Sequence, residues 1–253
     1  MMKSECVTAP TWEPLLFAFL CAIIPENTLD GIHMKKHQFL TGNMLKIIAA
    51  LSMLLDHGGL IFFPHEMGFR IAGRLAFPIF AFMIAEGCHY TRSRWRYWGM
   101  IAALAAVCQA VYYFAAGDTY LSVLVTFSLA IPTVFALEEW KKTKSSLWAA
   151  VTAGLVALIW LLNRWLEIDY GFWGCMLPVI VYAFRGRWQI LGLTLGLCLV
   201  AGQFGGLQWW SLMAVPLLWC YDGTVGKWKM KYFFYIFYPA HLAMLQVLAW
   251  IMV

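Results

Sequence analysis

The side chains of this 253-residue sequence that can do chemistry are polar and ionisable residues placed inside long apolar runs. An ionisable group in hydrocarbon is costly unless it meets a partner or a cavity, so each one is a candidate for function. A histidine beside a carboxylate can take a proton from a nucleophile, and arginine can stabilise negative charge that develops during a reaction. The candidates are Asp56 and His57 in LLDHGGLIFF, Arg70, Arg74 and Glu86 in the second apolar run, Gln109 in the third, and Tyr238 and His241 in the last.

Helical spacing places the first candidates at similar depths. His57 lies 13 residues after Met44, roughly 20 Å along a helix, and the two arginines stand at the start of the returning run. Arg70 and Arg74 are four residues apart and share one helix face. We expect Asp56 to orient His57. Because neighbours on a helix point about 100° apart, pairing of Asp56 with Arg74 or with another span is the open alternative.

Several candidates have purely structural alternatives. Arg70 can extend its guanidinium to the interface, and Glu86, roughly 18 Å deeper than Arg74 on a helix, can be solvated at the opposite surface. His241 follows Pro239 and can bond a carbonyl that a proline leaves free. Pro78 predicts a kink in the second run. The cysteines are scattered and form no cluster with histidine, so the sequence predicts no metal site.

The composition fixes the class of protein that must position these residues. The chain is 62% hydrophobic and 12% charged, whereas soluble domains are about 25% charged. This balance excludes small extracellular domains, coiled coils, disordered chains and nucleic-acid-binding domains. The sequence therefore predicts an all-α, polytopic transmembrane helical bundle in a lipid bilayer.

About nine membrane spans are expected, connected by short loops. The sixth and eighth are short, so one of them can be broken or re-entrant. Connections after even-numbered spans carry 11 lysines and arginines, which places those loops and the N-terminus inside by the positive-inside rule. The predicted spans are 44–64, 71–90, 97–116, 119–137, 147–166, 171–184, 189–204, 207–221 and 232–252.

The first 43 residues are expected to form a separate cytoplasmic or interfacial segment before a membrane domain over 44–253. Leu15–Pro25 is an apolar run of 11 residues, too short to span comfortably. An interfacial helix is favoured here, with a tenth span as the alternative.

Several segments together resemble the TraX family of conjugal-transfer membrane proteins. They are DHGGLIFF, FRIAGRLAFPIFAFMIAEG, YWGMIAALAAVCQAVYYFAAG, DYGFWG and YFFYIFYPAHL, in this order, from about Met44 to the C-terminus. The resemblance places the family's Asp-His motif on Asp56 and His57, its Gly-Arg-x-Ala-Phe-Pro element on residues 73–78, and its Tyr-x-x-His motif on Tyr238 and His241.

The resemblance implies acyl transfer in the bacterial inner membrane, since the family's type member N-acetylates F pilin. The expected donor is cytoplasmic acetyl-CoA, and the acceptor is an amine or hydroxyl of a pilin N-terminus or a glycan near the outer face. His57 is the expected base and Asp56 its catalytic partner. Arg74, Arg70, Glu86, Gln109, Tyr238 and His241 are expected to bind the substrates.

Two other functions remain open from the sequence. Intramembrane His, Asp, Arg and Glu side chains also form proton relays in transporters of small solutes or lipids. The absence of an internal repeat and the odd number of spans weigh against a transporter. A non-catalytic scaffold of a pilus or secretion apparatus is the third reading, and it gives no reason for the buried ionisable groups.

Overall fold

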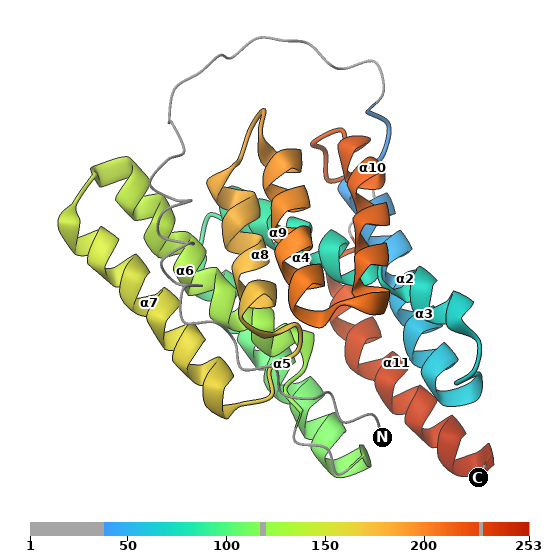
Figure 1. Ribbon diagram of the computed structural model, residues 1–253. Coiled ribbons are helices and arrows are strands. Elements are labelled where there is room, and N and C mark those ends of the chain that lie inside the picture. Colours follow the sequence, from blue (N-terminus) through green and yellow to red (C-terminus); the bar gives the residue numbers. More distant parts are fainter. Residues whose placement is uncertain (1–37, 117–119, 228–229, 253) are drawn as a thin grey trace.

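Long apolar segments with few charges form the helices of this protein. The computed structural model describes residues 38–116, 120–227 and 230–252, and these residues form a helical bundle without strands (Figure 1). The predicted all-α membrane fold is confirmed. The predicted interfacial helix at Leu15–Pro25 lies outside the described residues. The helices are α2 (Gly42–Phe62), α3 (Met67–Gly73), α4 (Ala76–Tyr90), α5 (Arg94–Ala116), α6 (Val123–Thr143), α7 (Ser146–Trp165), α8 (Gly171–Ala183), α9 (Gln189–Phe204), the 3₁₀ helix η2 (Gly206–Met213), α10 (Ala214–Trp219) and α11 (Lys231–Met252).

The described chain crosses the bundle back and forth nine times, as predicted, with α3 and α4 together making one crossing and η2 and α10 another. Five of these crossings are long and apolar enough to span a membrane: α2, α3–α4, α5, α6 and α7. We call the "basic end" the end with the loops at 91–93, 144–145, 184–188 and 220–227, which lies toward the top of Figure 1. The opposite "far end" carries the loops at 63–66, 120–122, 166–170 and 205.

The centre of the bundle is α8, whose 13 residues are all buried. Helices α4, α6, α7 and α9 pack around it. On the other side of α4, α2 packs against α3 and α11, and α11 also packs against α5. The bundle thus has one region around α8 and another formed by α2, α3, α5 and α11. The candidate residues predicted from the sequence are divided between these two regions.

The kink predicted for the second span corresponds to a short break between α3 and α4, across which Arg74 and Leu75 keep right-handed helical dihedral angles. Pro78 has no N–H to donate to the carbonyl of Arg74, four residues earlier. The helix stops at Gly73 and restarts at Ala76, and the amides of Arg74 and Leu75 instead bond the carbonyls three residues back, at 3.1 and 3.4 Å. The break places Arg74 at a helix junction within the bundle.

The eighth span is the broken one, as the sequence allowed. Gly205 and Gly206 both have positive φ, at 66° and 42°, and turn the chain from α9 into η2. A 3₁₀ helix rises about 2.0 Å per residue, so η2 and α10 together cover roughly 25 Å, about 4 Å more than 14 residues of α-helix would. The 3₁₀ segment thus lets a short sequence cross most of the bilayer.

The fourth span ends later than predicted. The prediction of 119–137 stopped at the first glutamate, whereas α6 continues to Thr143. Glu138 and Glu139 each form an ion pair with Arg94, at 2.9 and 2.5 Å. These pairs stabilise two further helical turns beyond the apolar stretch.

Candidate functional site

The two histidines predicted to be functional meet in the bundle although they are 184 residues apart in the sequence. His57 on α2 and His241 on α11 have Nδ1 and Nε2 3.0 Å apart, and their rings stack with centroids separated by 5.2 Å. His241 is buried, and the Phe237 ring also stacks with it, with centroids 5.2 Å apart. Tyr238, also buried, meets the His241 ring edge-on at 5.4 Å.

The hydrogen bonds of His241 determine the neutral tautomers of both rings. Its Nδ1 lies 3.0 Å from the carbonyl oxygen of Phe237, which can only accept, so this nitrogen carries the proton. His241 Nε2 is then the acceptor, and His57 Nδ1 donates to it. This leaves His57 Nε2 as the ring nitrogen with a free lone pair. From the sequence, His241 could bond the carbonyl that Pro239 leaves free, which is that of Tyr235, four residues before the proline. The structure shows that it bonds the Phe237 carbonyl instead.

Asp56 lies between two arginines and not against the His57 ring. Arg74 Nη2 donates to both carboxylate oxygens, at 2.9 and 2.8 Å, and Arg70 Nη1 lies 3.0 Å from Oδ1. All three side chains are largely buried. The expected contact of Asp56 with His57 is thus not seen: Asp56 pairs with Arg74, the alternative from the sequence, and with Arg70 in addition. The side-chain partner of His57 is His241.

Close backbone approach makes this cluster possible. A Cβ on Gly73 would collide with Asp56 Cβ and Cγ, and a Cβ on Gly59 would collide with Phe69. Both glycines thus let α2 lie directly against α3. The space beside Gly58 is open, so this neighbour plays no part in the contact.

Two polar residues of the site were missed by the sequence reasoning. Gln208 and Ser211 on η2 are 5% and 0% exposed, and Gln208 Oε1 accepts from Arg74 Nη1 at 3.3 Å. A 3₁₀ helix places residues i and i+3 on one face, and Gln208, Ser211 and Ala214 are all buried. Polar residues spaced by three in a short span were the signal that pointed to this face.

Glu86 belongs to a separate group near the basic end. Its Oε1 accepts from Arg185 Nη1 at 2.7 Å and from Gln189 Nε2 at 2.8 Å. Arg185 also lies over the ring of Tyr90, 5.2 Å from its centroid. The contacts of Glu86 thus connect α4 to the start of α9, and none of them reaches the histidine pair.

Gln109 belongs to a third group, in the loops of the far end. Its Nε2 donates to the Tyr120 carbonyl at 3.0 Å, and its Oε1 accepts from the Ser122 amide at 3.2 Å. The Tyr120 hydroxyl donates to Asp169 Oδ1 at 2.8 Å. Burial raises the pKa of Asp169 to about 6, against the lowering effect of the Tyr120 hydrogen bond. The hydrogen bonds of Gln109 therefore hold a loop in place.

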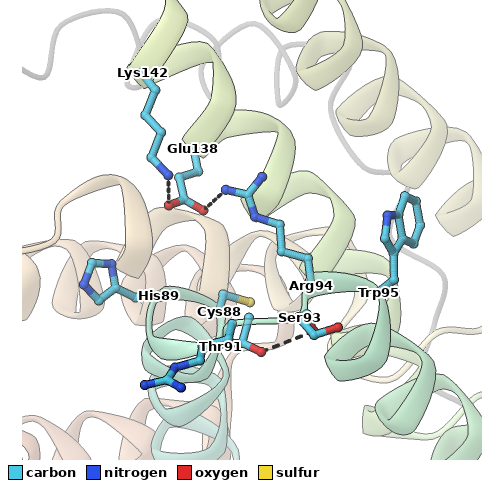
Figure 2. Close-up of a pocket in the computed structure, with 9 residues that line it drawn as sticks. Cys88, His89, Thr91, Ser93, Arg94, Trp95, Glu138 and Lys142 are labelled. Atoms are coloured by element: carbon cyan, nitrogen blue, oxygen red, sulfur yellow. Dashed lines mark hydrogen bonds and ion pairs between the residues drawn. The ribbon is translucent and has the colours of Figure 1, made fainter.

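A pocket of about 560 Å³ opens at the basic end, between the ends of α4 and α6 and the start of α5. Figure 2 shows Glu138 between Lys142 and Arg94, with the Glu138 oxygens 2.7 and 2.9 Å from the two cations. Residues 88–95 form the remaining wall, apart from Tyr90. Arg92 lines the pocket, is exposed, and has no ion-pair partner among the described residues. This end can accept an anion.

A helical bundle with a histidine pair and an Asp–Arg cluster among its spans is a polytopic membrane protein with an intramembrane polar site. The chain belongs to the TraX family, whose model, described as TraX protein, matches residues 41–249. The resemblance seen in the sequence is therefore confirmed.

The chain is similar to proteins from two bacterial species. It is 27% identical over 227 residues to Protein TraX of Escherichia coli, covering 82% of this chain and 86% of that protein. It is 28% identical over 226 residues to Protein TraX of Escherichia coli strain K12, with the same coverage of the two chains. It is also 28% identical over 227 residues to the probable fimbrial assembly protein FimC, serogroup H1, of Dichelobacter nodosus, covering 79% of this chain and 92% of that protein. No solved structure matches.

Proposed function

We propose that this protein is an integral-membrane acetyltransferase that moves the acetyl group of acetyl-CoA to an amine or hydroxyl acceptor. The observation that carries the proposal is the histidine pair. His57 donates from Nδ1 to His241, His241 donates to the Phe237 carbonyl, and His57 Nε2 keeps a free lone pair. A histidine oriented through one nitrogen and basic at the other is the arrangement that general-base catalysis requires.

The proposed reaction balances without any redox partner. His57 Nε2 takes the proton of the acceptor as its nitrogen or oxygen attacks the acetyl carbon. A C–N or C–O bond forms, the C–S bond breaks, and the CoA thiolate leaves with the proton that His57 held. Acetyl-CoA and the acceptor become free CoA and an acetamide or ester.

The residues around His57 have separate roles in this proposal. His241 positions the base and shares the charge of the imidazolium that forms. Asp56 with Arg70 and Arg74 carries one net positive charge, which favours an oxygen that becomes negative during attack. Tyr238 shields the histidine pair at its edge.

The donor is proposed to enter from the basic end, which faces the cytoplasm in this proposal and places the N-terminus inside. The pocket in Figure 2 offers Arg92 to the phosphates of acetyl-CoA. His57 lies 15 residues beyond Gly42 on α2, roughly 22 Å from that end, so the pantetheine arm would have to extend inward. The acceptor would then approach from the outer face of the inner membrane.

The relatives favour a pilus component as acceptor. One of them is named a probable fimbrial assembly protein, and the family resemblance implies acetylation of a pilin N-terminus. A glycan hydroxyl is the alternative acceptor, because the proposed base accepts a proton from either group.

Ion pairing of the carboxylates speaks against the transporter alternative. A proton relay needs carboxylates that can gain and lose a proton. Asp56 is held by two arginines, and Glu86 is held by Arg185 and Gln189. Among the candidate residues predicted from the sequence, the histidine pair therefore keeps the free site for a proton.

The test is acetyl transfer by the purified full-length protein in detergent, with acetyl-CoA as donor. Acceptor probes are a peptide with the N-terminus of F pilin and a glucosamine oligosaccharide. CoA release and the mass of the product are followed for the wild type, His57→Gln and His241→Gln. His65→Ala is the matched control, since His65 is exposed in the loop between α2 and α3.

We expect His57→Gln to lose turnover by about 100-fold or more, the usual size of a general-base contribution. His241→Gln should lower kcat and change the pH profile, because the orienting acceptor is altered, while His65→Ala should match the wild type. Full transfer by His57→Gln would remove the assigned base. A folded wild type that releases no CoA with either probe would overturn the proposed function and return the transporter and scaffold readings.

A further inference from the structure

The face of η2 that contacts Arg74 carries hydrogen-bonding groups that the described chain leaves unused. Gln208 Oε1 accepts from Arg74 Nη1, and because a guanidinium can only donate, this contact fixes the orientation of the amide. Gln208 Nε2 is therefore a donor on the opposite side, and it is buried without a hydrogen-bond partner in the described structure. The hydroxyl of Ser211, one 3₁₀ turn further, is also buried and without such a partner.

Other buried hydroxyls within the helices have partners. Thr126 donates to the Asp169 carbonyl at 2.7 Å, and Thr152 donates to the Trp148 carbonyl at 2.8 Å. The Ser211 hydroxyl makes no such bond in η2. The Ser122 hydroxyl, just before α6, is the other buried hydroxyl without a partner among the described residues. The 3₁₀ segment places Ser211 and Gln208 together on one buried face.

Unpartnered donors are costly in a membrane, because no bulk water replaces the missing partner. Buried polar groups in native proteins usually have a partner, so each exception needs an explanation, and a catalytic role is one of them. Here Gln208 contacts a cluster of one net positive charge, formed by Asp56, Arg70 and Arg74, and Ser211 lies one 3₁₀ turn further on the same face. Donors beside positive charge suit an oxygen with partial negative charge and no proton of its own.

We infer that Gln208 Nε2 and Ser211 Oγ form a binding site for a substrate carbonyl oxygen next to Arg74. The inference rests on the proposed acetyl transfer, in which two carbonyls are available: that of the acetyl thioester and those of an acceptor peptide. In either case Gln208 and Ser211 donate hydrogen bonds to the oxygen, and the positive cluster polarises it. As attack converts a thioester carbonyl to an oxyanion, the same donors bind it more tightly.

The test uses two substitutions that remove donors without removing other contacts. Ser211→Ala deletes a hydroxyl that has no partner, and Gln208→Glu keeps an oxygen acceptor for Arg74 while replacing the N–H group. Ser128→Ala is the matched control, because it deletes a hydroxyl that is already satisfied by the Leu124 carbonyl. All are made in the full-length protein, and thermal unfolding is measured beside function.

Two functional measurements distinguish the source of the carbonyl. The first compares binding of acetyl-CoA with that of CoA, which lacks the acetyl carbonyl. The second measures KM for the F-pilin peptide. If the acetyl carbonyl binds here, the wild type prefers acetyl-CoA and both variants lose about 10-fold of that preference. If an acceptor carbonyl binds here, KM for the peptide rises about 10-fold and donor binding is unchanged.

Ser211→Ala should show one of these two functional losses without a loss of stability. Its unfolding temperature should equal or exceed that of the wild type, because no existing hydrogen bond is lost. A lower unfolding temperature with unchanged binding and KM would make Ser211 structural and overturn the inference. Wild-type values in both variants would overturn it too, while the proposed function stood. A wild type without acetyl transfer would instead remove the proposed function and this inference with it.

Discussion

Replacing Arg74 should destabilise the protein more than replacing Arg70, although both arginines contact the same carboxylate. Arg74 donates to both oxygens of Asp56, to Gln208 Oε1 at 3.3 Å and to the Arg70 carbonyl at 3.4 Å. Arg70 contributes one ion-pair contact, to Asp56 Oδ1 at 3.0 Å. The Arg74 side chain is 13% exposed and the Arg70 side chain 26%.

The expected magnitudes follow from burial and from what each change leaves behind. Removing one partner of a buried pair costs about 3–5 kcal/mol, and an exposed pair contributes about 0–1 kcal/mol. Arg74→Ala leaves Asp56 with Arg70, so we expect the lower part of the buried range, about 3 kcal/mol. Arg70→Ala leaves the two-oxygen contact of Arg74 intact, and we expect about 1 kcal/mol.

The assay is a pair of double-mutant cycles in which Asp56→Ala is combined with each arginine substitution. Free energies of unfolding come from denaturant titrations in one detergent, where matching unfolding and refolding curves establish a two-state transition. The coupling energy between Asp56 and Arg74 should be about 2 kcal/mol, and that between Asp56 and Arg70 below about 1 kcal/mol. Equal couplings, or a larger one for Arg70, would refute the ranking by burial and hydrogen-bond number.

Three further predictions use other parts of the bundle. Gly73→Ala should destabilise the protein by about 1–3 kcal/mol in the same titrations, because the added methyl group collides with α2. Gly58→Ala is the control: position 58 faces open space, so this change should be neutral or stabilising, and equal effects of the two changes would contradict the packing argument. Stability should fall as pH rises from about 4 to about 6, because burial raises the folded-state pKa of Asp169 and the unfolded carboxyl ionises first; unfolding temperatures that fall equally in Asp169→Asn would assign the slope elsewhere. Arg185→Ala should lower the unfolding temperature by several degrees, because the buried Glu86 carboxylate then keeps only the Gln189 amide as a partner. Adding Glu86→Gln should recover part of the loss, and no recovery would exclude an uncompensated charge as its cause.

The spans were predictable because each rests on local properties of the sequence. Hydropathy and the alternation of basic loops do not depend on how helices pack. The break before α4 was predictable for the same reason, since Pro78 acts on its own helix. The end of α6 was misjudged because Arg94, on another helix, stabilises the glutamates that extend it.

Contacts within the site were predictable only where the charge of two residues and their depth in the membrane were enough to pair them. Asp56 and Arg74 carry opposite charges at the same depth of neighbouring spans, so their pairing was already an alternative in the sequence. The contact between His57 and His241 depends on α11 packing against α2, which no local pattern reveals. Gln208 was missed although its span was recognised as one of two short ones that could be broken, because its burial follows the three-residue period of η2, which hydropathy does not reveal.

The Asp-His dipeptide has a geometrical purpose on α2. Successive residues of a helix point about 100° apart, so Asp56 and His57 face different neighbours. Asp56 faces α3 and its arginines, and Gly59, three residues on and thus near the same face, contacts Phe69 of α3. Once these contacts fix the rotation of α2, His57 is directed at α11. The carboxylate thus positions His57 through the helix and not through a hydrogen bond to the imidazole, which leaves His241 to select the tautomer.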